Sequence, residues 1–148
     1  MTPGQIKRGI RRSFERSYPY IISAASAYAA WQYADAFQFE KLFSISITVA
    51  STAAGFLTAA ISILIGMKDS PLIESLRDNR HIEPLISYFI EALIGNVGLI
   101  AASSLLIIFS EFDQFQLTIW GLIAGLALGT TLRIFDLFAH LLREYLLQ

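Results

Sequence analysis

Long apolar stretches alternate with short polar segments along this chain. Four stretches are long enough to cross a membrane, and they cover residues 19–37, 43–67, 85–109 and 117–142. Each one approaches or exceeds the roughly 20 residues that a helix needs to cross about 30 Å of hydrocarbon. The pattern therefore predicts an all-α, polytopic membrane protein built as a bundle of four transmembrane helices.

The polar segments are too short to form a second domain. They are a leader at residues 1–18, a loop at 68–84 and a tail at 143–148. Of the 148 residues, 55% are hydrophobic and 16% are charged, whereas a soluble domain carries about 25% charged residues. We therefore expect one membrane domain, at residues 19–142, and no separate soluble domain.

The leader has a pattern of its own. Ile6, Ile10 and Phe14 recur every four residues among basic side chains. This spacing predicts an amphipathic helix that lies on the inner leaflet, with its basic residues near acidic lipid headgroups. The alternative is that the basic residues act only as a topology signal.

The distribution of positive charge predicts the orientation. Ten of the eleven Lys and Arg residues lie on one side of the four predicted spans, and Lys41 is the exception. Because segments rich in Lys and Arg near span ends stay in the cytoplasm, both termini and the 68–84 loop should be cytoplasmic. A rival topology has a short or interfacial first helix, since Gln32 and Asp35 weaken the outer half of the first stretch.

Three of the predicted spans carry small residues at helical spacing. The fourth span has Gly121, Gly125 and Gly129, the second has Ser44, Thr48, Ser51, Gly55, Thr58, Ser62 and Gly66, and the first has Ser23, Ala27, Ala30 and Ala34. Helices in lipid associate through close packing at such residues. These three rows of small residues, or seams, can all pack helices within one bundle. Alternatively, one seam can face a second copy of the chain or line a narrow path through the membrane. A single small bundle needs about two such seams, so three favour a homo-oligomer.

Ionisable side chains also occur inside the predicted spans. Glu91 lies about 9 Å from the inner end of the third span at ~1.5 Å per residue, and Arg133 lies in the inner part of the fourth. These helices should be antiparallel neighbours, so we expect a cluster of Glu91, Arg133 and Asp136 in the cytoplasmic third. The cluster is either a structural ion pair or an electrostatic gate or ion-coupling site. Asn96 lies deeper on the third span. It can form a hydrogen bond to a neighbouring helix, or it can be a polar point in a pathway.

The 68–84 loop can contain a short helix and a docking surface. Ser70 is a suitable N-cap and Pro71 a suitable first helical residue. The polar run that follows holds Arg77, Asp78, Arg80 and His81. It can dock a soluble cytoplasmic partner, or it can be a solvated connector.

Several kinds of chemistry are not predicted. The sequence has no cysteine, which removes disulfides and thiolate sites. It has no nucleophile–base pair, no metal-ligand cluster and no glycine-rich phosphate loop. His81 and His140 are isolated in sequence. We therefore expect no enzyme activity, no catalytic residues, no cofactor and no metal, and the net charge of −1 does not point to direct nucleic-acid binding.

Residues 51–143 resemble a known family. The run Ala53-Ala54-Gly55-Phe56-Leu57-Thr58-Ala59-Ala60-Ile61-Ser62-Ile63-Leu64-Ile65-Gly66 is followed by a charged loop, Ser70-Pro71-Leu72-Ile73-Glu74-Ser75-Leu76-Arg77, a third span and a short turn. In length, span count and this order of segments the chain resembles the RexB family of lambda-type phage exclusion. The resemblance implies a protein of the bacterial inner membrane that depolarises its host when a soluble sensor signals infection.

Three functions follow as expectations. The first is an oligomeric, gated, ion-conducting or membrane-depolarising effector in anti-phage defence. The second is a membrane anchor or adaptor for a soluble partner. The third is a small ion-coupled exporter in which Glu91 titrates. The lipid bilayer is the common partner of all three.

Overall fold

The chain is all-helical wherever its structure is described. A computed structural model describes residues 3–33, 38–66, 82–109 and 113–146, with side chains for 17–33, 38–66, 85–109, 113–139 and 143. These residues form four α-helices: α1 (Pro3–Gln32), α2 (Phe39–Gly66), α4 (Ile82–Phe109) and α5 (Gln114–Leu146). A helix bonds its backbone groups within its own segment, as a membrane-spanning segment must.

Three of the helices are long and apolar enough to cross a membrane. These candidate spans are Phe39–Gly66, Leu85–Phe109 and Gln114–Ala139, and they match the second, third and fourth predicted spans closely. The predicted leader and first span form one helix, α1, in the structure, with Pro19 inside it. Because residues 34–37 lie outside the described part of the chain, the apolar part of α1 that is described is short, and a fourth span stays a prediction.

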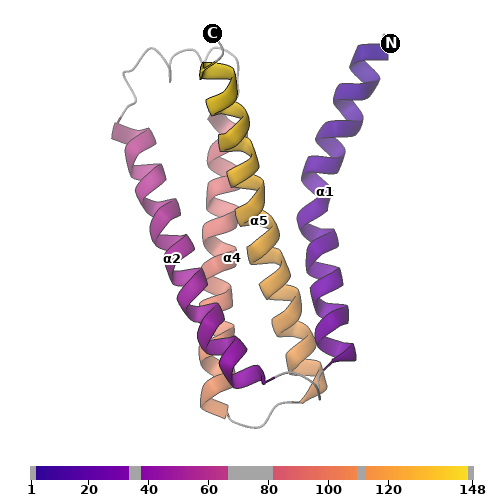
Figure 1. Cartoon of the computed structure of the whole chain (residues 1–148), viewed down its shortest axis with the longest axis vertical. Helices are drawn as coiled ribbons and strands as arrows, with labels where there is room; N and C mark the ends of the chain where they lie inside the picture. Colours follow the sequence, from indigo (N-terminus) through magenta and orange to yellow (C-terminus); the bar gives the residue numbers. More distant parts are fainter. Residues whose placement is uncertain (1–2, 34–37, 67–81, 110–112, 147–148) are drawn as a thin grey trace.

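Helix α5 lies at the centre of the arrangement. Helix α1 packs on one side of α5, α4 packs on another, and α2 packs mainly on α4 with few contacts to α5. Figure 1 shows α1 and α2 on opposite sides of α5, and both chain ends at the same end of the molecule. The helices therefore form an open row, in the order α1, α5, α4, α2.

The glycines of α5 allow α1 to approach closely. A Cβ atom added at Gly125 would lie 2.6 Å from Ser23 Cα, and one at Gly121 would lie 2.7 Å from Ala30 Cβ. At Gly129 the nearest atom is Pro19 Cα, at 2.7 Å. No larger residue fits without movement, so the predicted small-residue seams of the first and fourth spans pack against each other.

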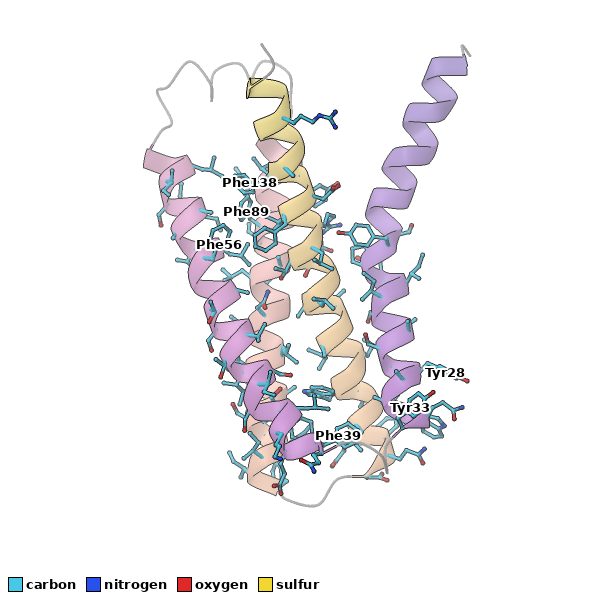
Figure 2. The ribbon with its side chains drawn as sticks, in the orientation of Figure 1. Tyr28, Tyr33, Phe39, Phe56, Phe89 and Phe138 are labelled. Carbon is cyan, nitrogen blue, oxygen red and sulfur yellow. The ribbon has the colours of Figure 1, made fainter. Side chains whose placement is uncertain are left out.

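Two hydrophobic clusters stabilise the packing of α2 on α4 and α5. The first contains Phe39 and Phe43, whose rings each meet the Trp120 ring edge-on. The second lies nearer the chain ends and includes Phe89, which meets Phe138 edge-on at 5.7 Å between ring centroids. Figure 2 shows Phe39 at the end away from the termini, and Phe89 and Phe138 towards the termini. Such aromatic contacts add about 0.5–1.5 kcal/mol each beyond the burial of area.

The start of α5 also forms a bond with the end of α1. The Asp113 backbone N–H donates to Gln116 Oε1 at 3.4 Å, as in a capping box. Gln114 Nε2 donates to the Trp31 carbonyl oxygen at 3.1 Å, near the end of α1. These bonds satisfy backbone groups that a helix end would leave without partners.

Candidate functional site

A partly buried ion pair joins α4 and α5. The Arg133 guanidinium donates through Nη2 to Glu91 Oε2. Glu91 lies six residues after Leu85, where the α4 span begins, and Arg133 lies six residues before Ala139, where the α5 span ends. Because the two helices run antiparallel, these equal offsets place the charges at the same depth, about 9 Å from the span ends at ~1.5 Å per residue.

Two tyrosines complete the surroundings of the ion pair. The Arg133 guanidinium carbon lies 4.0 Å from the centroid of the Tyr88 ring, in cation–π geometry. The Tyr20 hydroxyl donates to Glu91 Oε1 at 3.2 Å. Tyr20 belongs to α1, so both oxygens of one carboxylate are engaged by two different helices. The result is a cluster that links α1, α4 and α5.

The two charges differ in their access to the surroundings. The Arg133 side chain is 5% exposed and that of Glu91 is 36% exposed. Arg133 Nε is buried and has no hydrogen-bond partner among the described residues. A buried charge that loses its partner costs about 3–5 kcal/mol, so Glu91 is what allows Arg133 to be buried. This arrangement suits a structural cross-link better than a free mobile charge.

Asp136, the third predicted member of the cluster, lies next to the ion pair on α5. It is exposed on α5, three residues beyond Arg133 and therefore nearly one turn away. The charges of Arg133 and Asp136 both act on the hydroxyl of Tyr18 on α1. The third predicted member of the cluster therefore extends it towards α1.

Polar side chains continue the contact between α4 and α5 along its length. Asn96 Nδ2 donates to Thr131 Oγ1 at 2.9 Å and to the Ala92 carbonyl oxygen at 2.8 Å. Further along, Trp120 Nε1 donates to Ser103 Oγ at 2.8 Å. With the ion pair, these form a ladder of three polar contacts across one helix pair. Of the two predicted roles of Asn96, this geometry favours interhelical hydrogen bonding.

The small-residue seam of α2 has a different environment. Its members Ser44, Thr48, Ser51, Gly55, Thr58, Ser62 and Gly66 are all exposed. A Cβ atom added at Gly55 or Gly66 would meet nothing within 4 Å. Three seam hydroxyls are satisfied within α2 itself, because Thr48 Oγ1, Thr58 Oγ1 and Ser62 Oγ each donate to the carbonyl four residues earlier. Within one chain, none of the described helices therefore packs against the seam.

Other predicted site residues lie outside the described part of the chain. These are Arg77, Asp78, Arg80 and His81 of the predicted docking run, together with Ser70 and Pro71. The described residues contain no group of three His, Asp or Glu side chains placed to hold a metal ion.

The partners of the charged and polar groups could not be predicted from the sequence pattern. Tyr20, Tyr88, Thr131 and the Ser103–Trp120 contact were not predicted as site residues. A signal existed for Tyr88, because it precedes Glu91 by three residues and so shares its helix face. No comparable signal identifies Tyr20, whose place depends on how α1 packs.

Comparisons of the chain with known protein families, with curated proteins and with solved structures gave no match. The resemblance to the RexB family, and everything it implies, stays a prediction.

Proposed function

We propose that this chain is a four-span membrane protein that assembles as a homo-oligomer and conducts ions along its α2 helices. The proposal for α1 rests on its contact with α5. Pro19, Ser23 and Ala30 lie directly against Gly129, Gly125 and Gly121, and those glycines occupy the middle of a candidate span. A helix that packs on this section of α5 shares its depth, so α1 enters the bilayer too.

The orientation of the assembly follows from charge. Figure 1 places the N- and C-termini at one end, where five Lys and Arg residues of the leader and Arg143 of the tail also belong. Positive residues near span ends stay cytoplasmic. The termini and the 68–84 loop therefore face the cytoplasm in this scheme, and the setting is a bacterial inner membrane.

The exposed hydroxyl-bearing face of α2 is the observation that carries the function. Of the three candidate spans, α2 is the least buried, at 11% of its span window against 33% for each of the others. Among the described residues, the seam lies opposite the packed face of α2. A Cβ atom added at Gly55 meets nothing within 4 Å, whereas Leu57, two positions later and so about 160° around the helix, is fully buried. Small residues allow close helix contact, and hydroxyls can replace part of an ion's hydration shell.

Conduction along α2 leaves the ion pair outside the path. Glu91 and Arg133 hold α1, α4 and α5 together, so they support each subunit while α2 faces its symmetry mates. An open path would dissipate the membrane potential, which is worth about 2.3 kcal/mol per elementary charge per 100 mV. Loss of potential on a signal from a soluble sensor is the defence role that the RexB resemblance implies.

Cysteine cross-linking tests the assembly directly, because the chain has no cysteine of its own. Single cysteines at Ser51, Gly55 and Ser62 sample the seam. Controls at Val49 and Ile63 sample the exposed apolar side of the same helix, where the side chains are 62% and 61% exposed. We expect membrane-embedded dimers to form through the seam positions and not through the controls. Equal cross-linking at both sets, or none at either, would contradict an α2-lined assembly.

Ion flux tests the second half of the proposal. The chain is produced in bacterial cells, alone and with its neighbouring genes, and a voltage-sensitive dye reports the membrane potential. We expect depolarisation, and we expect Gly55→Leu to reduce it while Val49→Leu does not. Seam cross-links without depolarisation in any of these settings would exclude conduction and leave the anchor or adaptor role.

A further inference from the structure

The attachment of α1 to the rest of the molecule is uneven. Against α5, α1 packs along several turns through Pro19, Ser23 and Ala30, and Ser23 Oγ donates to the Leu122 carbonyl oxygen at 2.7 Å. Against α4, the side-chain bond described is the one from Tyr20 to Glu91. A glycine seam holds two helices at a short distance, but it does not by itself prevent α1 from swinging around α5.

We propose that the hydrogen bond from Tyr20 to Glu91 is a releasable latch that sets the position of α1 around α5. The bond is 3.2 Å long and lies in exposed surroundings, so it is easily broken compared with the close-packed glycine contacts. Glu91 keeps its ion pair with Arg133 when the Tyr20 hydroxyl leaves. Release therefore costs no unpaired buried charge, which makes the change reversible.

The latch lies where the N-terminal half of α1 begins, and this half can act as a lever. Tyr20 directly follows Pro19, a fully buried residue that rests on Gly129. Proline has no N–H, so the Glu15 carbonyl loses its helical partner and α1 can bend there. From this point α1 continues to Pro3, a length of about 26 Å at ~1.5 Å per residue. Figure 1 shows this N-terminal half diverging from α5.

The consequence is a coupling between the leader and the ion pair. A displacement of the N-terminal half of α1 moves the Tyr20 hydroxyl relative to Glu91. Conversely, loss of the bond at Glu91 allows a small rotation of α1 near Tyr20, which becomes a larger displacement at its N-terminal end. The latch concerns the position of α1 and stands whether or not the assembly conducts ions. A distance measurement can therefore test it apart from ion flux.

Spin-label distances between α1 and α4 test the latch. Labels at Ser13→Cys, on the N-terminal half of α1, and Ile86→Cys, on the exposed side of α4, are measured in nanodiscs. The labelled protein is diluted with unlabelled protein so that only distances within one chain contribute. We expect Tyr20→Phe to broaden and lengthen the distance distribution, raising the undocked population roughly three- to tenfold, as the loss of one hydrogen bond implies.

Tyr28→Phe is the matched control. Tyr28 is also an exposed tyrosine of α1, but the bond described for its hydroxyl is accepted from Gln32 of the same helix, so this variant should give the parent distribution. Unfolding followed by the fluorescence of Trp31 and Trp120 verifies that both variants remain folded. Identical distributions for Tyr20→Phe and Tyr28→Phe would overturn the latch, and a shift only in Tyr20→Phe would establish it.

Discussion

The glycine stripe of α5 and the seam of α2 have nearly the same spacing and opposite environments. On α5, Gly121 and Gly125 are covered by the backbone of α1, and an added Cβ would come within 2.8 Å of it. On α2, Gly55 has nothing within 4 Å. Small residues at helical spacing therefore permit another helix to approach closely, but they do not determine which helix packs there. The partner depends on which helices the connections bring side by side.

The polar side chains of the two regions differ in the same way. Between α4 and α5, Asn96 and Arg133 bond to side chains of the neighbouring helix. On α2, Thr58 and Ser62 bond to their own backbone. Hydroxyls that donate to a carbonyl oxygen of their own helix are tolerated in lipid, and their oxygen atoms can still accept a bond from a second helix. We therefore expect substitutions between α4 and α5 to affect each subunit, and substitutions on the α2 seam to affect assembly.

Removal of Glu91 should have the largest effect on the subunit. Glu91→Gln leaves the buried Arg133 guanidinium without its charged partner, so the free energy of unfolding should fall by about 3–5 kcal/mol. Tryptophan fluorescence during unfolding in mixed micelles measures this change. The double variant Glu91→Gln with Arg133→Met should recover part of the loss because no unpaired charge remains, and Ser62→Ala on α2 should change little. A Glu91→Gln protein as stable as its parent would mean that the ion pair does not hold the subunit together.

Alanine substitution of one glycine on α5 and one on α2 should have effects of intermediate size on the free energy of unfolding. The two effects should have opposite signs. Gly125→Ala places a methyl group 2.6 Å from Ser23 Cα, so α1 must move, at a cost of about 1–3 kcal/mol. Gly55→Ala meets open space and should gain up to about 1 kcal/mol from helix propensity. The same unfolding measurement compares them. Equal effects at the two positions would show that α1 does not occupy the glycine stripe of α5.

Loss of a single hydrogen bond should have the smallest effect. Asn96→Ala removes the contact with Thr131 and should lower the free energy of unfolding by about 0.6–2 kcal/mol, the range measured for side-chain bonds between membrane helices. Thr58→Val removes a hydroxyl whose bond lies within α2 and should leave subunit stability within about 0.5 kcal/mol. A larger loss at Thr58 than at Asn96 would reverse the proposed division between the two regions.

Much of the fold could be read from hydropathy because each span is a local property. Residues 43–67 and 85–109 became α2 and α4 within a few residues, since a helix in lipid satisfies its backbone without help from distant residues. The short turn between the last two helices also brought Glu91 and Arg133 to the same depth. Their pairing was therefore predictable from chain order and a rise per residue alone.

The contacts that give the site its character depend on packing between distant segments. Tyr20 reaches Glu91 across 71 positions of sequence, and only because α1 docks on the glycines of α5. Two seams of similar spacing became an internal contact and an open face, because α1 lies beside α5 while α2 packs mainly on α4. The hydrophobicity and charge of the local sequence determined where each helix begins and ends. Helix partners were decided by shape, since in hydrocarbon it is close fit and hydrogen bonding, not apolar character, that distinguishes one neighbour from another.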